Sequence, residues 1–200
     1  MTLRSVGGDR STAERVARHV PGEPGVWILL FGDMVVFGAF FATFMYQRSL
    51  APELFDASRR TLSIGIGLAN TLILLTSSLF VVTAIRAIRQ GQRRAAQLLL
   101  VGALLCGMAF VALKAVEYTA KMSQGHVPTQ NNFYLYFFIL TDLHLFHVLI
   151  GVVVLLLLLT QARRTELSTT RMALVEGGGC FWHLVDLLWI VLFPLLYLVS

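Results

Sequence analysis

Ionisable side chains lie inside the most apolar stretches of this 200-residue chain. The stretch 181–199 is apolar enough for a membrane, yet it carries His183 and Asp186 near its start. An ionised group near the centre of a bilayer costs about 2.5–3.5 kcal/mol on insertion scales, so such groups face a bundle interior or a partner. Imidazoles and carboxylates in that setting could relay protons, ligate a metal ion or hold helices together.

Helical spacing aligns these groups. His144 and His147 are three residues apart, as are His183 and Asp186, so each pair shares one face of a helix. At a rise of about 1.5 Å per residue, Asp33 and the His183 pair lie at similar depths in the cytoplasmic half, and His147 lies near the middle. We therefore predict one buried polar seam, structural or proton-linked, whose members are Asp33, Glu117, His144, His147, Glu176, His183 and Asp186.

A metal or haem site is a sharper interpretation of the same residues. His144, His147 and His183 could supply three ligands, and Asp33 and Asp186 could complete a carboxylate-rich site. However, the chain has no HxxxH pair and no Glu-x-x-His pair repeated on two helices, and any two imidazoles could be proposed as haem ligands. We therefore predict no metal and no redox cofactor in this chain.

Long apolar runs must position these residues. The chain is 56% hydrophobic and 14% charged, and a helix needs about 20 apolar residues to cross the hydrocarbon layer. The runs predict an all-α, polytopic membrane protein with a five-helix bundle. The predicted spans are 26–46, 62–85, 95–113, 133–160 and 177–199.

The distribution of Arg and Lys predicts the orientation. Eleven of the 16 cations lie in the first 25 residues and in the second and fourth connections, which would share one side of the membrane. The positive-inside rule places that side, and the N-terminus, in the cytoplasm. We predict an Arg-rich cytoplasmic tail at 1–25 and a membrane domain at 26–200. Loop asymmetry accounts for the basic character, so no nucleic-acid partner is predicted.

Other residues in the spans suit helix packing. Asn70 and Ser77 lie on one face of the second span, and Gly151 permits close approach in the fourth. We assign packing roles to these three and to Trp182 and Trp189. Lys114 and Glu117, three residues apart, predict an ion pair.

Four motifs carry a family resemblance. The segment F-W-H-L-V-D-L-L-W at 181–189 resembles the Y-W-H-F-V-D-x-x-W signature in the last helix of subunit III of the haem-copper oxidases. The segment T-D-L-H-L-F-H-V at 141–148, with Gly151, resembles the family's T-G-x-H-G-x-H-V-x-x-G, although Asp142 and Leu145 replace two glycines. K-A-V-E-Y at 114–118 and the N-T and S-S pairs at 70–71 and 77–78 resemble its other motifs.

Within that family the chain is most similar to the accessory protein of nitric oxide reductase gene clusters, the NorE type. This likeness is carried by the segment 21–27, which leads into the first span, by G-D-M at 32–34 and by F-P-L-L-Y at 193–197. Asp33 stands where the cytochrome oxidase branch usually has Glu. Five spans instead of seven mean that two N-terminal helices of the longer members are missing.

The resemblance implies a non-catalytic subunit in a bacterial cytoplasmic membrane. Its partner would be the haem-bearing catalytic subunit of a haem-copper oxidase or nitric oxide reductase, with haem, and copper or non-haem iron, held in that partner. The implied roles are assembly, stability and proton uptake, with membrane lipid as a further ligand. Two alternatives remain open: a small proton-coupled transporter, although the chain shows no inverted repeat, and a membrane metalloenzyme.

Overall fold

The structure of the chain, a computed structural model, describes residues 24–164 and 168–199, which form helices joined by short turns and loops, without strands. The predicted tail at 1–25 lies outside the described residues except for its last two. The helices are α1 (Pro24–Leu50), α2 (Pro52–Arg59), α3 (Ile64–Arg89), α4 (Arg93–Ser123), α5 (Asn132–Ala162) and α6 (Thr169–Phe193), followed by the π-helical turn η1 (Pro194–Leu198).

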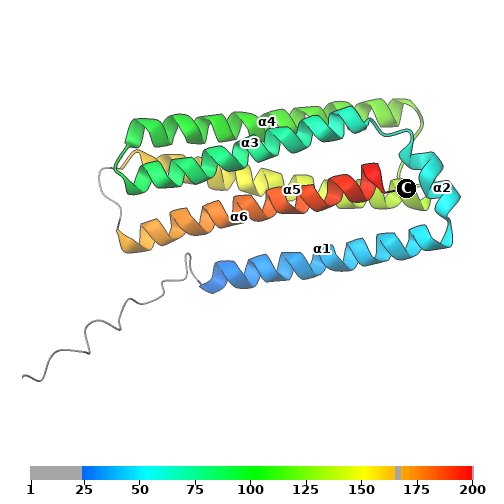
Figure 1. Ribbon diagram of the computed structural model, residues 1–200, viewed down its shortest axis with the longest axis horizontal. Coiled ribbons are helices and arrows are strands. Elements are labelled where there is room, and N and C mark those ends of the chain that lie inside the picture. The colour runs from blue at the N-terminus through cyan, green and yellow to red at the C-terminus, as the bar shows by residue number, and fades with distance from the viewer. Residues whose placement is uncertain (1–23, 165–167, 200) are drawn as a thin grey trace, which may run out of the picture.

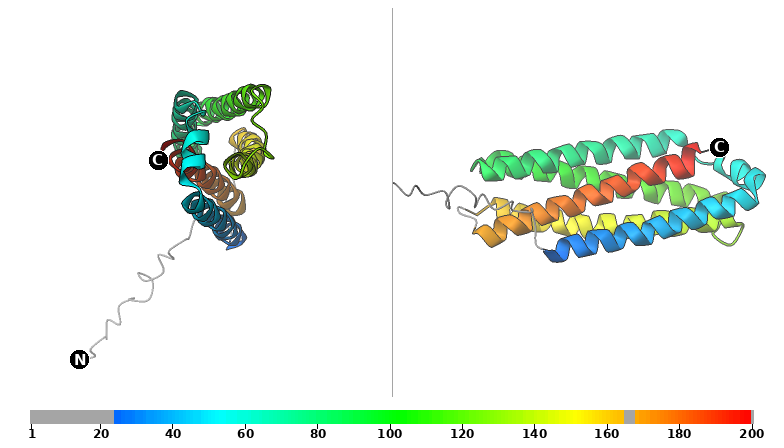
Figure 2. Two further views of the ribbon diagram at one scale, coloured as in Figure 1. Left: turned by 90° about the vertical axis from the view of Figure 1, so that its right-hand side faces the viewer. Right: turned by 60° about the horizontal axis from the view of Figure 1, so that its bottom comes forward.

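Five of these helices are long and apolar enough to cross a membrane, which confirms the predicted all-α membrane fold. Each contains most of one predicted span and extends beyond it at one or both ends. Figure 1 shows the long helices lying roughly parallel, with α3 beside α4 at one edge and α1 at the other. The end-on view of Figure 2 shows α6 and α5 between these edges, and α1 packs mainly against those two and α2.

The short helix α2 was not predicted. It follows α1 directly and lies across one end of the bundle (Figure 1). Its Phe55 is buried between the rings of Phe44 on α1 and Phe133 on α5, at centroid distances of 5.4 and 5.7 Å. One aromatic side chain therefore joins α2 to two long helices.

Two tight turns reverse the chain. Gly91, after α3, and Gly125, after α4, have φ of +71° and +80°, in the left-handed region where a side chain would be strained. These turns make α3, α4 and α5 successive antiparallel neighbours, so α3 and α5 run in the same direction (Figure 1).

The last turn of the chain widens at Pro194. Proline has no backbone N–H for the helical ladder, and the backbone N–H of Val199 instead donates to the carbonyl of Pro194 at 2.9 Å, across five residues. This turn buries Tyr197 completely. The altered register brings the Tyr197 hydroxyl to charged residues of α4.

Candidate functional site

Asp33 and His147 meet between α1 and α5. Asp33 Oδ1 lies 3.4 Å from His147 Nε2, and the Asp33 side chain is 20% exposed. His147 Nδ1–H donates to the carbonyl of Leu143 at 2.7 Å, which fixes the ring and leaves Nε2 facing the carboxylate. Phe37 packs edge-on against the imidazole, with centroids 5.5 Å apart. Because α1 packs against few other elements, this pair is a polar link that holds it to the bundle.

A second polar group joins α6 to α3. His183 Nδ1 and the Ser78 hydroxyl lie 2.6 Å apart. Asp186, one turn further along α6, is buried, and neither of its carboxylate oxygens has a hydrogen-bond partner among the described residues. His183 Nε2 is also buried without a hydrogen-bond partner among the described residues. In this group, therefore, polar atoms outnumber their protein partners.

His144 lies apart from both groups, in an aromatic cage. It is fully buried, and its ring centroid lies 5.5 Å from that of Phe110 and 5.3 Å from that of Trp189. Neither ring nitrogen has a hydrogen-bond partner among the described residues. Trp189, which packs against His144, also joins α6 to α3, because its Nε1–H donates to the Thr71 hydroxyl at 3.0 Å.

A buried ion pair lies beside this cage. Lys114 Nζ donates to Glu117 Oε2 at 2.8 Å and to the Tyr197 hydroxyl at 3.0 Å, and that hydroxyl donates to Glu117 Oε1 at 2.7 Å. The Lys114 side chain is only 1% exposed and that of Glu117 2%. Lys114 Nζ also lies 4.5 Å from the centre of the Trp189 ring. The three polar groups thus satisfy one another and clamp η1 onto α4.

Glu176 is far from this interior. Its Oε1 accepts a hydrogen bond of 2.8 Å from Arg89 Nη2, at the end of the bundle where α3 ends and α6 begins. The Arg89 side chain is 55% exposed. The Glu176 side chain is 10% exposed, so this ion pair between helix ends reaches solvent on its Arg89 side only.

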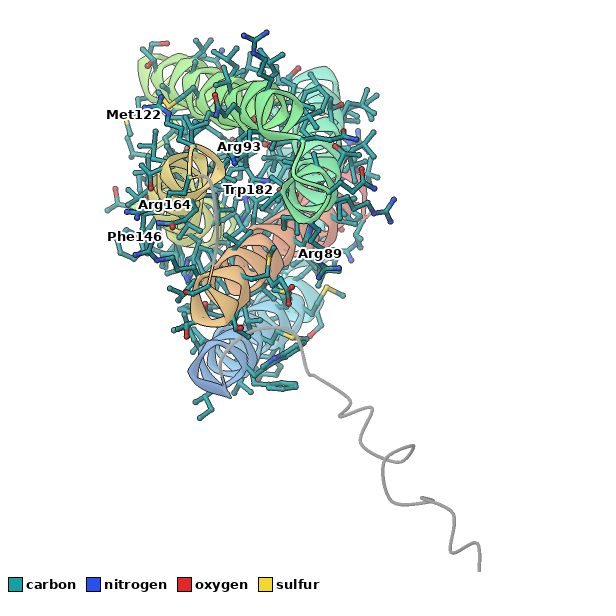
Figure 3. All side chains as sticks on the ribbon, turned by 90° about the vertical axis from the view of Figure 1, so that its left-hand side faces the viewer. Arg89, Arg93, Met122, Phe146, Arg164 and Trp182 are labelled. Carbon is teal, nitrogen blue, oxygen red and sulfur yellow. The ribbon has the colours of Figure 1, made fainter. Side chains whose placement is uncertain are left out.

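The predicted packing residues lie at helix contacts. A Cβ on Gly151 would lie 2.6 Å from Cε3 of the Trp182 ring, so only glycine lets that buried ring approach α5. Figure 3 shows Trp182 in the interior between the long helices. The Ser77 hydroxyl donates to the carbonyl of Ala103 at 3.1 Å, joining α3 to α4. Asn70 is fully buried on the same helix.

The predicted polar seam is thus resolved into separate groups. The structure brings Asp33 and His147 together from the first and fourth spans, but it does not bring His183, Asp186 or Glu176 to them. The predicted Lys114–Glu117 ion pair is confirmed. Sequence reasoning missed Tyr197 and Ser78, the two hydroxyls that complete the polar groups. The S-S pair at 77–78 was a signal for the second, whereas nothing in the helical period pointed to the first.

Comparison with known proteins gives the family. The model of the family described as cytochrome c oxidase subunit III matches residues 21–200. The chain belongs to this subunit III family. A protein of Staphylococcus aureus (strain USA300) named probable quinol oxidase subunit 3 is 29% identical over 183 residues, covering 88% of each chain. One of Staphylococcus epidermidis with the same name is 28% identical over 183 residues, again with 88% of each chain covered.

Membership of the subunit III family has two consequences. Subunit III of a haem-copper oxidase carries no cofactor itself and associates with the subunit that does. Within residues 24–164 and 168–199, no group of three or more His, Cys, Asp or Glu residues could hold a metal ion. The separate positions of His144, His147 and His183 give the reason, since each has a different helix or ring as its neighbour.

Proposed function

We propose that this chain is a non-catalytic subunit III that stabilises a haem-bearing catalytic subunit and sustains its proton uptake during turnover. The observation that carries the proposal is that its buried charged groups join helices of the bundle to one another: Asp33 with His147, and Lys114 with Glu117 and Tyr197. A chain whose charges serve its own packing offers a rigid surface to a partner. Its partner is either a haem-copper oxidase, of quinol or cytochrome type, or a nitric oxide reductase of the NorE-associated kind.

The remaining polar residues have supporting roles in this proposal. His144, His183 and Asp186 are buried or half-buried groups with unpartnered atoms, and they are the candidates for a proton-linked role. Glu176 fixes the start of α6 through Arg89. The N-terminus and the Arg89 end of the bundle face the cytoplasm, the bilayer is the bacterial inner membrane, and lipid contacts the outer helix faces.

An optical spectrum tests the proposal most directly. The tagged chain is purified from its own membranes in mild detergent, and spectra are recorded oxidised and reduced. Co-eluting haem is expected because subunit III has a haem-bearing partner. An a-type spectrum would identify an oxidase of that class, and b- and c-type bands without copper would identify a nitric oxide reductase. A colourless chain that elutes alone would contradict the proposal, and proton flux into vesicles holding only this chain would then be measured for the transporter alternative.

The Asp33–His147 pair provides a test at residue level. Asp33→Asn keeps the shape of the side chain but removes the charge that faces His147, at an expected cost of about 1–3 kcal/mol in the attachment of α1. We expect less haem per tagged chain, or an earlier decline of activity during sustained turnover. Asp56→Asn is the matched control, because it makes the same chemical change in an ion pair at the end of the bundle. There Asp56 Oδ1 lies 3.8 Å from Arg59 Nε. Wild-type haem content together with wild-type endurance in Asp33→Asn would refute the role given to this pair.

A further inference from the structure

Asp142 is a carboxylate on the outside of a membrane span. It lies ten residues after the start of α5, about 15 Å along the helix axis. The described parts of the five spans hold five acidic residues, and Asp142 is the exposed one; Asp33 and Glu176 are half-buried, and Glu117 and Asp186 are buried. An exposed carboxylate at this depth lies against hydrocarbon unless another protein covers it.

The interior does not provide a counter-ion for Asp142. The nearby cation is Lys114, whose hydrogen bonds go to Glu117 and Tyr197. Asp142 forms no ion pair with any described residue. The Tyr118 hydroxyl donates to Thr141 at 2.6 Å and also lies within hydrogen-bonding reach of Asp142, so it is a neutral partner for this carboxylate. Asp142 is exposed and has a neutral hydroxyl but no counter-ion beside it, so its charge is open to a donor from another chain.

Asp142 is central in a stripe of exposed residues on α5. The stripe advances by alternate steps of four and three residues, the period of one helix winding against another. It consists of Leu135, Ile139, Asp142, Phe146, Leu149 and Val153. Figure 3 shows Phe146 on the outer edge of the bundle, away from Trp182 in the interior. The stripe of α5 is thus an apolar helix face with one acid at its centre.

We propose that this stripe docks against a transmembrane helix of the haem-bearing catalytic subunit, which presents a cation or a hydrogen-bond donor to Asp142. Charge decides the occupant: lipid chains offer no donor at this depth, whereas a partner helix can carry one. A second copy of this chain would place two like carboxylates close together, which is unfavourable. The inference rests on the proposed function, because it takes the catalytic subunit as the partner.

Site-specific photo-crosslinking in native membranes tests the docking face. A photoreactive amino acid replaces Phe146 in one variant and Leu79 on α3 in the control. The two side chains are matched, because they are 58% and 60% exposed and lie 14 and 15 residues after the starts of helices that run in the same direction. We expect position 146 to crosslink to the catalytic subunit and position 79 to give no such product. A crosslink from 79 alone, or a product of 146 with lipid alone or with a second copy of this chain, would overturn the inference.

Substitution of Asp142 adds a second test, in which a fall or no fall in haem per tagged chain decides between a docked and a lipid-facing stripe. Asp142→Leu removes a negative charge. That charge is unfavourable against lipid, but a hydrogen-bond donor of a partner helix would need it. If the stripe docks, haem per tagged chain falls by about 10- to 100-fold in Asp142→Leu, the range for a lost hydrogen bond to a charged group, and by less in Asp142→Asn. If the stripe faces lipid, Asp142→Leu retains all its haem, and the inference fails while the proposed function stands. Absence of haem from the unsubstituted chain is the separate result that would remove the proposed function.

Discussion

The buried ion pair of α4 predicts an order of stabilities that apolar packing would not produce. Glu117→Gln is nearly isosteric, but it leaves the Lys114 ammonium, 1% exposed, without its carboxylate. Removing one partner of a buried pair costs about 3–5 kcal/mol, because the remaining charge is buried without compensation. Tyr197→Phe leaves the pair intact and removes the hydroxyl that bridges it at 3.0 and 2.7 Å. Each such bond to a charged group is worth about 1.5–3 kcal/mol, and the neighbours partly recover it.

Replacement of the whole network gives the decisive comparison. The triple variant Lys114→Met, Glu117→Leu and Tyr197→Phe keeps similar volumes and leaves no polar atom to desolvate. Replacing buried charges by apolar residues of similar volume is often neutral or stabilising by about 1–4 kcal/mol. We therefore expect the triple variant to be more stable than Glu117→Gln, although it carries three substitutions.

Unfolding in mixed micelles with a rising fraction of dodecyl sulfate measures these differences. Trp189 lies 4.5 Å from Lys114 Nζ, so the fluorescence of its indole reports the loss of packing at this site. Glu176→Gln is the control, because its partner Arg89 is 55% exposed and stays hydrated when the carboxylate is lost, so we expect a smaller loss of stability than in Glu117→Gln. A triple variant as unstable as Glu117→Gln would refute the electrostatic account and assign the cost to packing.

Two packing contacts give further predictions. Gly151→Ala places a methyl group 2.6 Å from Cε3 of Trp182, so we expect a loss of about 1–3 kcal/mol in the same unfolding assay, with a changed indole spectrum; an unchanged stability would mean that the ring moves without cost. Ser77→Ala removes a hydrogen bond of 3.1 Å to the carbonyl of Ala103 and should cost about 0.6 kcal/mol, whereas Thr76→Ala, whose hydroxyl bonds only within its own helix at 2.8 Å, should cost less.

The transmembrane architecture followed from the sequence because hydrocarbon thickness fixes the length of an apolar run. The five spans were predicted in order, and most of their ends were placed inside the helices, since a helix continues into the polar interface where hydropathy no longer marks it. The start at 62 and the end at 199 were instead placed just outside the helices. The helix α2 was missed for a related reason. It has only eight residues, and it is held by contacts with other helices, such as those of Phe55 with the rings of Phe44 and Phe133.

Sequence spacing placed polar residues correctly on helix faces but not opposite one another. His144 and His147 lie on the same side of α5, yet one contacts Phe110 and Trp189 and the other contacts Asp33. The rotation of each helix about its axis depends on its neighbours, and the helical period carries no information about it. Tyr197 was missed because the π-helical turn at Pro194 changes the period itself.

The positions of the acidic residues connect the fold to the proposed assembly. Glu117 has a counter-ion within its own helix and Glu176 has one across the bundle, while Asp33 faces an imidazole. Such residues can be satisfied in the isolated chain, so their substitution affects partner binding only through the stability of the bundle. Asp142 differs, because it is exposed at membrane depth and has no counter-ion among the described residues. Its substitution should therefore weaken the complex more than it weakens the bundle, where only the contact with Tyr118 is lost. The ratio of haem loss to lost unfolding stability then separates a docking residue from a packing residue.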